Sequence, residues 1–162
     1  MNVDATVQGG FGKAGIGGVL RYHNGLCLMC FSKSIGVADP PGAELMAILE
    51  ACRLFQSSRW YCQDKLLIES DCKLVVSWIA NQRVIPSHLE NLVANCKAYC
   101  ESCSWKVGFV YREINVDAHA LAQEGIERNP AFFGLRRTFR LTRSDENCLM
   151  LARYQIIQYV VK

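Results

Sequence analysis

The sequence predicts an α/β domain built on a mixed β-sheet. Three short runs within residues 2–32 have the composition of β-strands, and after residue 42 the spacing of apolar residues becomes helical. Further along, short apolar runs alternate with helical stretches. The expected order is therefore strand, strand, strand, helix, strand, helix, helix, strand, helix. The strand–helix–strand crossovers in such an order should be parallel and right-handed.

The first three strands are expected to be antiparallel. Residues 2–7, NVDATV, alternate and lead into the Gly-rich stretch QGGFGKAG. The β-type runs at 16–22 and 26–32 follow, and the turn His23-Asn24-Gly25 separates them. An Asn-Gly pair between two such runs is a hairpin signal.

A helix, a strand and a second helix are expected next. Residues 43–55 place their large apolar side chains on one helical stripe, which consists of Leu45, Ile48, Leu49, Cys52 and Phe55. Residues 65–70, KLLIES, form a short apolar run that is typical of a buried strand. Residues 71–82 should form the second helix, with Asp71 as its N-cap.

The last three elements are a helix, a strand and a final helix. Pro86 suits the first turn of a helix. Residues 105–111, WKVGFVY, favour a strand. Asn115 is a good N-cap for the final helix, which we expect to run to about Glu127.

Charge divides the chain into two parts. Residues 1–127 carry 11 Lys and Arg against 13 Asp and Glu, whereas residues 128–162 carry 7 against 2. We expect one domain over 1–127 and a basic, then apolar, C-terminal extension over 128–162 whose fold the sequence does not predict. The basic stretch could contact phosphate or be a solvated tail, and the tail is the interpretation that we favour. No apolar run approaches the ~20 residues that span a bilayer, and no signal peptide is found. We therefore expect an intracellular protein of the nucleus or cytoplasm.

The nine cysteines are interpreted as reduced thiols that pack as small apolar side chains. Two pairs, Cys27 with Cys30 and Cys100 with Cys103, have CxxC spacing, so a zinc site built from both is conceivable. However, Cys27 and Cys30 lie in an expected strand, where residues three positions apart point to opposite faces. A shared metal ion is therefore not expected.

Three acidic residues lie where this order of elements could bring them together. Asp4 lies inside the first strand, and Asp71 ends the fourth, at the edge where sites form in parallel α/β sheets. Glu44 is expected in the first turn of the first helix. Clustered carboxylates repel one another unless a cation binds them, and Mg²⁺ prefers oxygen ligands. Two such ions suit phosphodiester cleavage.

Five sequence blocks together resemble the ribonuclease H type 1 family, and most closely its plant reverse-transcriptase-like branch. They are NVDA (2–5), GIGGVLR (15–21), AELMAILEA (43–51), IESD (68–71) and REINVDAHALA (112–122). The resemblance covers residues 1–127. It implies an RNase H-like five-stranded mixed sheet of order 3-2-1-4-5, with helices on both faces. It also implies endonucleolytic hydrolysis of the RNA strand of an RNA–DNA hybrid, with two Mg²⁺ (or Mn²⁺) ions held by four carboxylates.

The resemblance assigns three of these carboxylates as catalytic and metal-binding. Asp4, Glu44 and Asp71 stand at the family's motif positions. In the family pattern Asp4 and Asp71 touch both ions, and Glu44 supports the ion on the leaving-group side.

The fourth position of the family motif falls on a histidine in this chain. Counted from Asn115, this position is His119 and not Asp117. These two residues are two positions apart and therefore lie about 200° from each other around the helix. His119 should therefore face the acidic site as the fourth catalytic and metal-binding residue, while Asp117 has a structural role. Neutral imidazole is a poor Mg²⁺ ligand and suits Mn²⁺ or Zn²⁺ better, so a slow enzyme is expected.

The resemblance also implies a substrate surface for an RNA–DNA hybrid. Gly10, Gly12 and Gly42 would allow close backbone approach to the 2′-hydroxyls of the RNA strand. Lys73 and Arg112 are the nearest candidate phosphate contacts. The basic handle of many bacterial members is missing, because only NQRVIP joins the two middle helices. We expect a monomer with nucleic acid, and no membrane, as its partner.

Three alternatives to an efficient ribonuclease H stay open. The domain could bind nucleic acid with weak catalysis, it could be another nuclease of the superfamily, or it could be a protein-interaction domain with a vestigial site. An exonuclease pattern requires Asp-x-Glu on the first strand, and Thr6 stands at that position, which argues against the second alternative.

Overall fold

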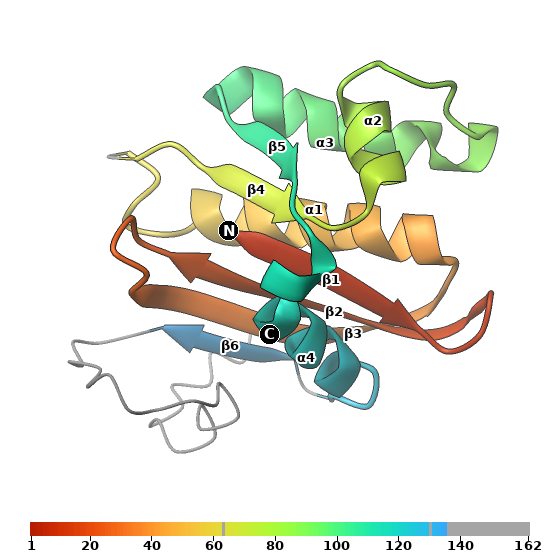
Figure 1. The fold of residues 1–162 in the computed structure, drawn as a ribbon, viewed down its shortest axis with the longest axis horizontal. Helices are drawn as coiled ribbons and strands as arrows, with labels where there is room; N and C mark the ends of the chain where they lie inside the picture. The colour runs from red at the N-terminus through yellow and green to blue at the C-terminus, as the bar shows by residue number, and fades with distance from the viewer. Residues whose placement is uncertain (63, 130, 136–162) are drawn as a thin grey trace.

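A six-stranded mixed sheet forms the centre of the computed structural model, which describes residues 1–62, 64–129 and 131–135 (Figure 1). The strand order is β5-β4-β1-β2-β3-β6. The strands are β1 (Asn2–Val7), β2 (Gly12–Arg21), β3 (Cys27–Ala38), β4 (Leu67–Ser70), β5 (Lys106–Phe109) and β6 (Phe132–Leu135).

The strand directions follow the sequence prediction, but the number of strands does not. β1, β2 and β3 pair antiparallel, whereas β1 with β4 and β4 with β5 pair parallel. The expected five-strand order is therefore confirmed, and β6, from the C-terminal extension, adds a sixth strand antiparallel to β3. β3 has 12 residues, and β6 pairs with backbone groups that would otherwise form an open sheet edge.

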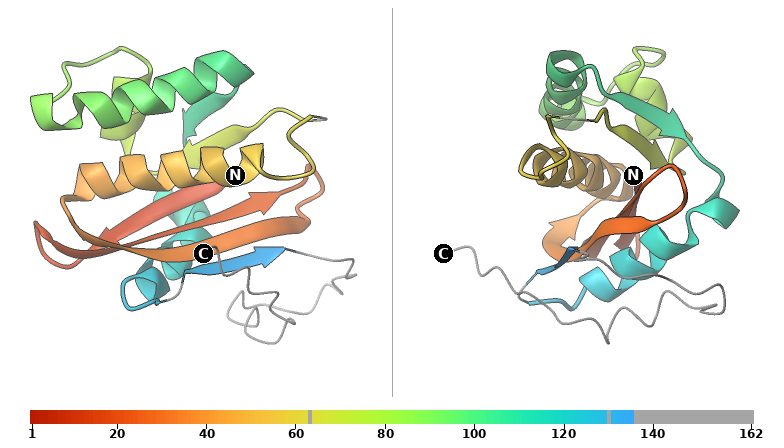
Figure 2. Two further views of the ribbon diagram at one scale, coloured as in Figure 1. Left: turned by 180° about the vertical axis from the view of Figure 1, so that it is seen from behind. Right: turned by 90° about the vertical axis from the view of Figure 1, so that its left-hand side faces the viewer.

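In the described part of the chain, four α-helices and two 3₁₀ turns connect the strands. They are α1 (Pro40–Gln56), α2 (Lys73–Ile79), η1 (Ser87–Leu89), α3 (Glu90–Cys103), η2 (Arg112–Ile114) and α4 (Val116–Gly125). Figure 2 shows α1 and α3 on one face of the sheet and α4 on the other. Among the described residues, no helix is long and apolar enough to cross a membrane.

The core lies between the sheet and α1. Leu45, Ile48, Cys52 and Phe55 of the expected stripe are buried in it, and Leu49 packs against it half-buried. Strand residues and α3 complete this core with Val3, Phe31, Ile68, Val93 and Cys96. Full burial of a large aliphatic side chain contributes roughly 1.5–3 kcal/mol, so this stripe fixes α1 over β1.

Three helix starts differ from the prediction: Pro86 caps η1 and α3 begins at Glu90, and the other two affect site residues. α1 begins at Pro40, because Pro40 and Pro41 fit the first turn and Asp39 occupies the N-cap position. Glu44 therefore lies in the second turn, not the first. α2 begins at Lys73 with Cys72 at its N-cap, so Asp71 precedes the cap position.

Glycines of β2 let α4 pack directly on the sheet. A Cβ atom at Gly15 or Gly17 would lie within 3.0 Å of backbone atoms of Ala122. The Ser32 hydroxyl of β3 donates a 2.6 Å hydrogen bond to the carbonyl of Leu121. The GIGG block is thus the surface on which α4 rests, and it places the start of α4 against β1.

The β2–β3 hairpin is confirmed, and it contains a bulge that the sequence did not indicate. Gly25 has φ +82° in the turn. Leu20 pairs with Met29 but Arg21 pairs with Cys27, so β3 has one extra residue there. Because of this residue, Cys27 packs against the cluster of Val19, Cys30 and Leu121 and so lies on the same face of the sheet as Cys30. The expectation that these two cysteines point to opposite faces was wrong.

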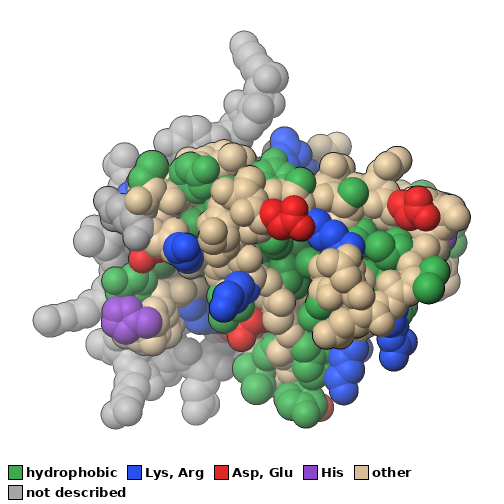
Figure 3. Space-filling view, turned by 90° about the horizontal axis from the view of Figure 1, so that it is seen from above, with side chains coloured by type: hydrophobic (Ala, Val, Ile, Leu, Met, Phe, Trp, Pro, Cys, Tyr) green, Lys and Arg blue, Asp and Glu red, His purple; other side chains and the backbone are tan. Residues whose placement is uncertain are grey.

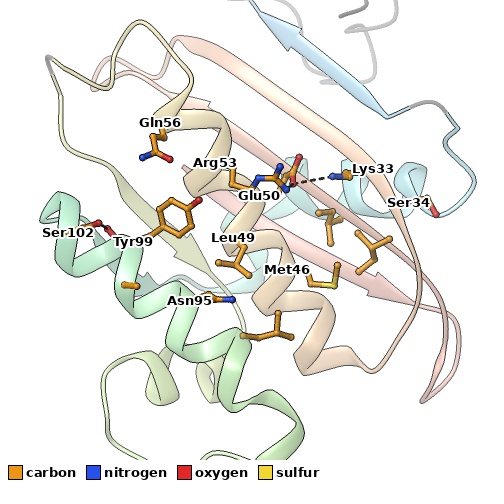
Figure 4. A pocket seen from close by; sticks show the side chains of 14 residues that line it. Lys33, Ser34, Met46, Leu49, Glu50, Arg53, Gln56, Asn95, Tyr99 and Ser102 are labelled. Carbon is orange, nitrogen blue, oxygen red and sulfur yellow. Dashed lines mark hydrogen bonds and ion pairs between the residues drawn. The ribbon is translucent and has the colours of Figure 1, made fainter. Parts of the chain in front are cut away.

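A groove of about 730 Å³ runs along α1, α3 and β3 (Figure 4). Met46, Leu49 and Tyr99 are among the residues that line it. Its acidic residue, Glu50, lies 3.2 Å from Lys33 Nζ and 3.8 Å from Arg53 Nη1. The three acids singled out in the sequence do not line this groove.

Candidate active site

Three carboxylates from three separate elements meet at one end of the parallel strands. Asp4 comes from β1, Glu44 from α1, and Asp71 follows β4. One carboxylate oxygen of each lies within 4.8 Å of the others. Within the described part of the chain, this is the group of His, Cys, Asp and Glu side chains that could hold a metal ion.

The sheet register explains how these acids come together. β1 and β4 are parallel, and Val3 pairs with Ser70, so the next residues, Asp4 and Asp71, leave the two strands side by side. α1 packs across β1 and β4 and brings Glu44 over the same point. The Ser70 hydroxyl donates a 3.3 Å hydrogen bond to Glu44 Oε2 and so links the helix to the strand end.

Ionisation of the acidic group is unfavourable without a bound cation, because its carboxylates are close together and partly or fully buried. Asp4 is 3% exposed and Glu44 is 9% exposed. Burial, first of all, and then the neighbouring carboxylates raise the pKa of Glu44 well above its ordinary value. Burial also raises the pKa of Asp4, against the opposing hydrogen bond from His119. A small set of clustered oxygen ligands in this state fits a hard divalent cation.

His119 faces the site, as the count from Asn115 predicts, but it contacts Asp4. Its Nδ1 lies 2.6 Å from Asp4 Oδ2, and its Nε2 lies 3.5 Å from Arg112 Nη2. A guanidinium can only donate, so Nε2 accepts from Arg112 and the Nδ1–H donates to Asp4. Neither ring nitrogen belongs to the group of ligand atoms within 4.8 Å of one another. In this structure His119 holds a carboxylate and is not placed as a fourth metal ligand.

Asn115 is a site residue that the sequence interpretation missed. Its side chain makes no capping hydrogen bond on α4. Instead, Asn115 is 1% exposed, and its Nδ2 donates to the Val3 carbonyl at 2.9 Å and to Asp71 Oδ1 at 3.5 Å. Its amide therefore joins the start of α4 to β1 and orients Asp71. An asparagine just before a helix is usually a cap, and nothing local distinguishes the two roles.

Asp117 points away from the acidic group and pairs with Arg21 of β2. Both side chains are about one-third exposed, and a pair of this kind contributes at most about 1 kcal/mol. The pair attaches the first turn of α4 to the sheet. This position agrees with the structural role expected for Asp117.

The glycines expected at the substrate surface have local explanations. A Cβ atom at Gly12 would clash with the Gln8 carbonyl across the β1–β2 turn, and one at Gly42 would clash with Asp39 Oδ1. Gly10 lies in the same exposed turn, and a Cβ atom there would meet nothing within 4 Å. The turn geometry thus requires Gly12, whereas at Gly42 the clash is with the end of a side chain that can move.

Both expected phosphate contacts lie beside the acidic group. Lys73 begins α2 two residues after Asp71, and its Nζ lies 4.7 Å from the ring centroid of Phe109. Arg112 lies in η2 and approaches His119. The structure therefore places one cation on each of two elements that border the site.

Glu44→Gln should stabilise the metal-free protein near neutral pH. The folded state holds the Glu44 proton more tightly than the unfolded chain does, so stability falls as the pH rises above the ordinary pKa of 4.5. A neutral amide removes this loss of stability. We therefore expect the free energy of unfolding to increase by about 1 kcal/mol, measured as a rise of several degrees in Tm. Added Mg²⁺ should then raise the Tm of the variant less than that of the wild type.

Glu50 of the same helix provides a matched control for Glu44. It is also buried, but Lys33 and Arg53 neutralise it. Glu50→Gln should therefore lower the Tm and leave the response to Mg²⁺ unchanged. A fall in Tm for both variants would contradict the idea that Glu44 is poorly compensated without a cation.

The sequence model of the family described as "Reverse transcriptase-like" matches residues 2–125. No curated protein matches the chain in sequence. Among solved structures, LC11-RNase H1, isolated from compost by a metagenomic approach, is 24% identical and covers 78% of this chain and 93% of its own, with a TM-score of 0.72.

Two further structures show the same similarity. RNase H1 from the halophilic archaeon Halobacterium salinarum NRC-1 is 21% identical and covers 78% of this chain and 95% of its own, with a TM-score of 0.66. The N-terminal RNase H domain of rv2228c from Mycobacterium tuberculosis, a fusion with maltose binding protein, is 22% identical, covers 77% and 90%, and has a TM-score of 0.65. At these identities the similarity shows a shared fold, and the RNase H-like fold expected from the five sequence blocks is confirmed.

Proposed function

This chain belongs to the reverse transcriptase-like family, and on that premise we propose that it hydrolyses the RNA strand of RNA–DNA hybrids. The observation that carries the proposal is the convergence of Asp4, Glu44 and Asp71 on this fold. One of the similar structures is LC11-RNase H1 in complex with an RNA/DNA hybrid, at 24% identity. The same kind of substrate is proposed here.

The proposed cofactors are two Mg²⁺ ions, with Mn²⁺ as the alternative. Asp4, Glu44 and Asp71 would hold them, and bound ions of this kind supply an activated water and stabilise the leaving oxygen. The neighbouring residues of the chain keep these carboxylates in place. Asn115 holds Asp71 and the His119 imidazole holds Asp4, so two of the three ligands cannot turn freely. This fixed arrangement reduces the reorganisation needed when substrate binds.

Affinity for the hybrid should depend only weakly on salt, because the salt dependence grows with the number of phosphate contacts. The domain over residues 1–127 has slightly more acidic than basic residues, and no basic handle lies between α2 and α3. Few cations are therefore available for phosphate contacts, among them Lys73 and Arg112. Discrimination of RNA from DNA would come from contacts with 2′-hydroxyls, near the Gly-rich β1–β2 turn.

A second candidate function is nucleic-acid binding with weak catalysis. The observation that favours it is the contact between His119 and Asp4. The imidazole occupies one oxygen of a proposed metal ligand and supplies no negative charge. Such a site would hold divalent cations more weakly than four carboxylates.

The test compares three labelled duplexes of one sequence: an RNA–DNA hybrid, an RNA duplex and a DNA duplex. We expect cleavage of the RNA strand of the hybrid alone, in Mg²⁺ or Mn²⁺, and none in EDTA. Binding is measured in parallel by fluorescence anisotropy in EDTA. Hybrid binding without cleavage in either cation would favour the second candidate, and neither binding nor cleavage would contradict both.

A further inference from the structure

An aromatic pair, half-buried Phe109 and exposed Tyr111, lies at the edge of the sheet that carries the acidic group. Phe109 ends β5 and pairs with Ser70 of β4, and the Val110 amide donates a 3.0 Å hydrogen bond to the Ser70 carbonyl. Asp71 follows Ser70 in the chain, so Phe109 and the nearby Tyr111 lie at the same edge of the sheet as the carboxylates. The proposed mechanism makes no use of either ring.

Tyr111 is held in place although it is not part of the core. Tyr111 is 63% exposed. The ring centroids of Phe109 and Tyr111 are 5.3 Å apart at an interplanar angle of 76°. Lys73 Nζ lies 4.7 Å from the Phe109 centroid and 5.9 Å from that of Tyr111. An edge-to-face contact and a cation–π contact thus hold the Tyr111 ring while much of it stays open to solvent.

Two cationic residues lie close to Tyr111. Lys73 lies over it, and Arg112, the next residue in the chain, approaches His119, which in turn contacts Asp4. The surface above α2 and α3 in Figure 3 likewise shows hydrophobic side chains lying among Lys and Arg side chains. An open aromatic ring next to cations is the combination by which proteins bind single-stranded nucleic acid, because a base stacks on the ring and the cations contact the phosphates.

We propose that Tyr111, together with Lys73 and Arg112, binds an unpaired nucleotide of the substrate next to the acidic group. An unpaired base in an overhang can offer a whole face to a side-chain ring, whereas a base inside a duplex is already stacked on both sides. The domain should therefore prefer hybrids that carry a single-stranded overhang over blunt hybrids of equal length. This inference rests on the proposed function, since it assumes that a nucleic acid approaches the carboxylates.

The test measures binding in EDTA, so that no hydrolysis contributes. A blunt RNA–DNA hybrid is compared with the same hybrid carrying a single-stranded overhang with 2-aminopurine in it. We expect Tyr111→Ala to weaken binding of the overhang hybrid about tenfold and to leave binding of the blunt hybrid unchanged. Tyr111→Phe keeps the ring and should behave as the wild type. Stacking should also change the 2-aminopurine fluorescence with wild type and Tyr111→Phe, but not with Tyr111→Ala.

Tyr22 offers a matched control, because it is an exposed tyrosine in the β2–β3 turn. Tyr22→Ala should not alter either Kd. Equal loss on both hybrids with Tyr111→Ala, or wild-type binding of both, would overturn the inference. Circular dichroism melting of each variant shows whether it folds. Overhang preference without any cleavage by the wild type would support this site and contradict the proposed catalysis, whereas hybrid cleavage without overhang preference would do the reverse.

Discussion

Replacing Asp71 with asparagine should reduce hybrid cleavage about a thousandfold, because losing several kcal/mol of metal-assisted stabilisation slows a reaction by that order. Asparagine has nearly the same size as aspartate but no charge. Asp71 lies in the three-carboxylate group and accepts a hydrogen bond from Asn115. We expect the variant to fold, and its Tm to rise less than that of the wild type when Mg²⁺ is added.

Asp117→Asn is the matched control for this experiment. It makes the same chemical change on α4, where Asp117 pairs with Arg21 away from the acidic group. Cleavage by this variant should stay within about twofold of wild type, with a small loss of Tm from the partly exposed ion pair. Unchanged cleavage by Asp71→Asn would remove the metal mechanism. Equal losses in both variants would mean that α4 placement, and not ligand charge, controls the rate.

The arrangement of strands could be predicted because it depends on local patterns. The Asn24-Gly25 turn fixes a hairpin, and the change from strand to helical spacing fixes the crossovers. β6 was not predicted, because its four residues, Phe132–Leu135, do not alternate between apolar and polar side chains. They form a strand by pairing with β3. The start of α1 was missed for a different reason. The helix was expected from residue 43, where the helical spacing of apolar residues starts, whereas α1 begins at Pro40 because proline fits the first turn of a helix.

The site could be predicted in its residues but not in its contacts. The positions of Asp4 and Asp71 follow from strand register, which the sequence pattern indicates. The roles of Asn115 and His119 depend on how closely α4 approaches β1. That distance is set by Gly15 and Gly17 of β2, which are distant in sequence from both. A single helix pattern cannot show whether an asparagine caps its own helix or reaches across to another strand.

His119→Asp should raise Mg²⁺-dependent cleavage by about tenfold or more, equal to at least ~1.4 kcal/mol. The substitution places a carboxylate on the side of α4 that faces Asp4 and releases Asp4 Oδ2 from the imidazole. Four carboxylates without a cation repel more strongly than three. The metal-free variant should therefore melt at a lower temperature than the wild type, and Mg²⁺ should raise its Tm by more. Initial rates over a Mg²⁺ titration, with Tm at each concentration, measure both effects.

His119→Asn distinguishes the effect of an added negative charge from the effect of losing the hydrogen bond to Asp4. Asparagine removes the imidazole as aspartate does, but adds no charge. A gain with aspartate alone would show that a missing fourth carboxylate limits the rate. Equal gains with both would show that the limit is the hydrogen bond to Asp4, since each variant breaks it. An active wild type with no gain from either substitution would mean that three carboxylates are sufficient here. His119 would then serve the site by fixing Asp4 through one ring nitrogen while Arg112 contacts the other, which is the arrangement that the structure shows.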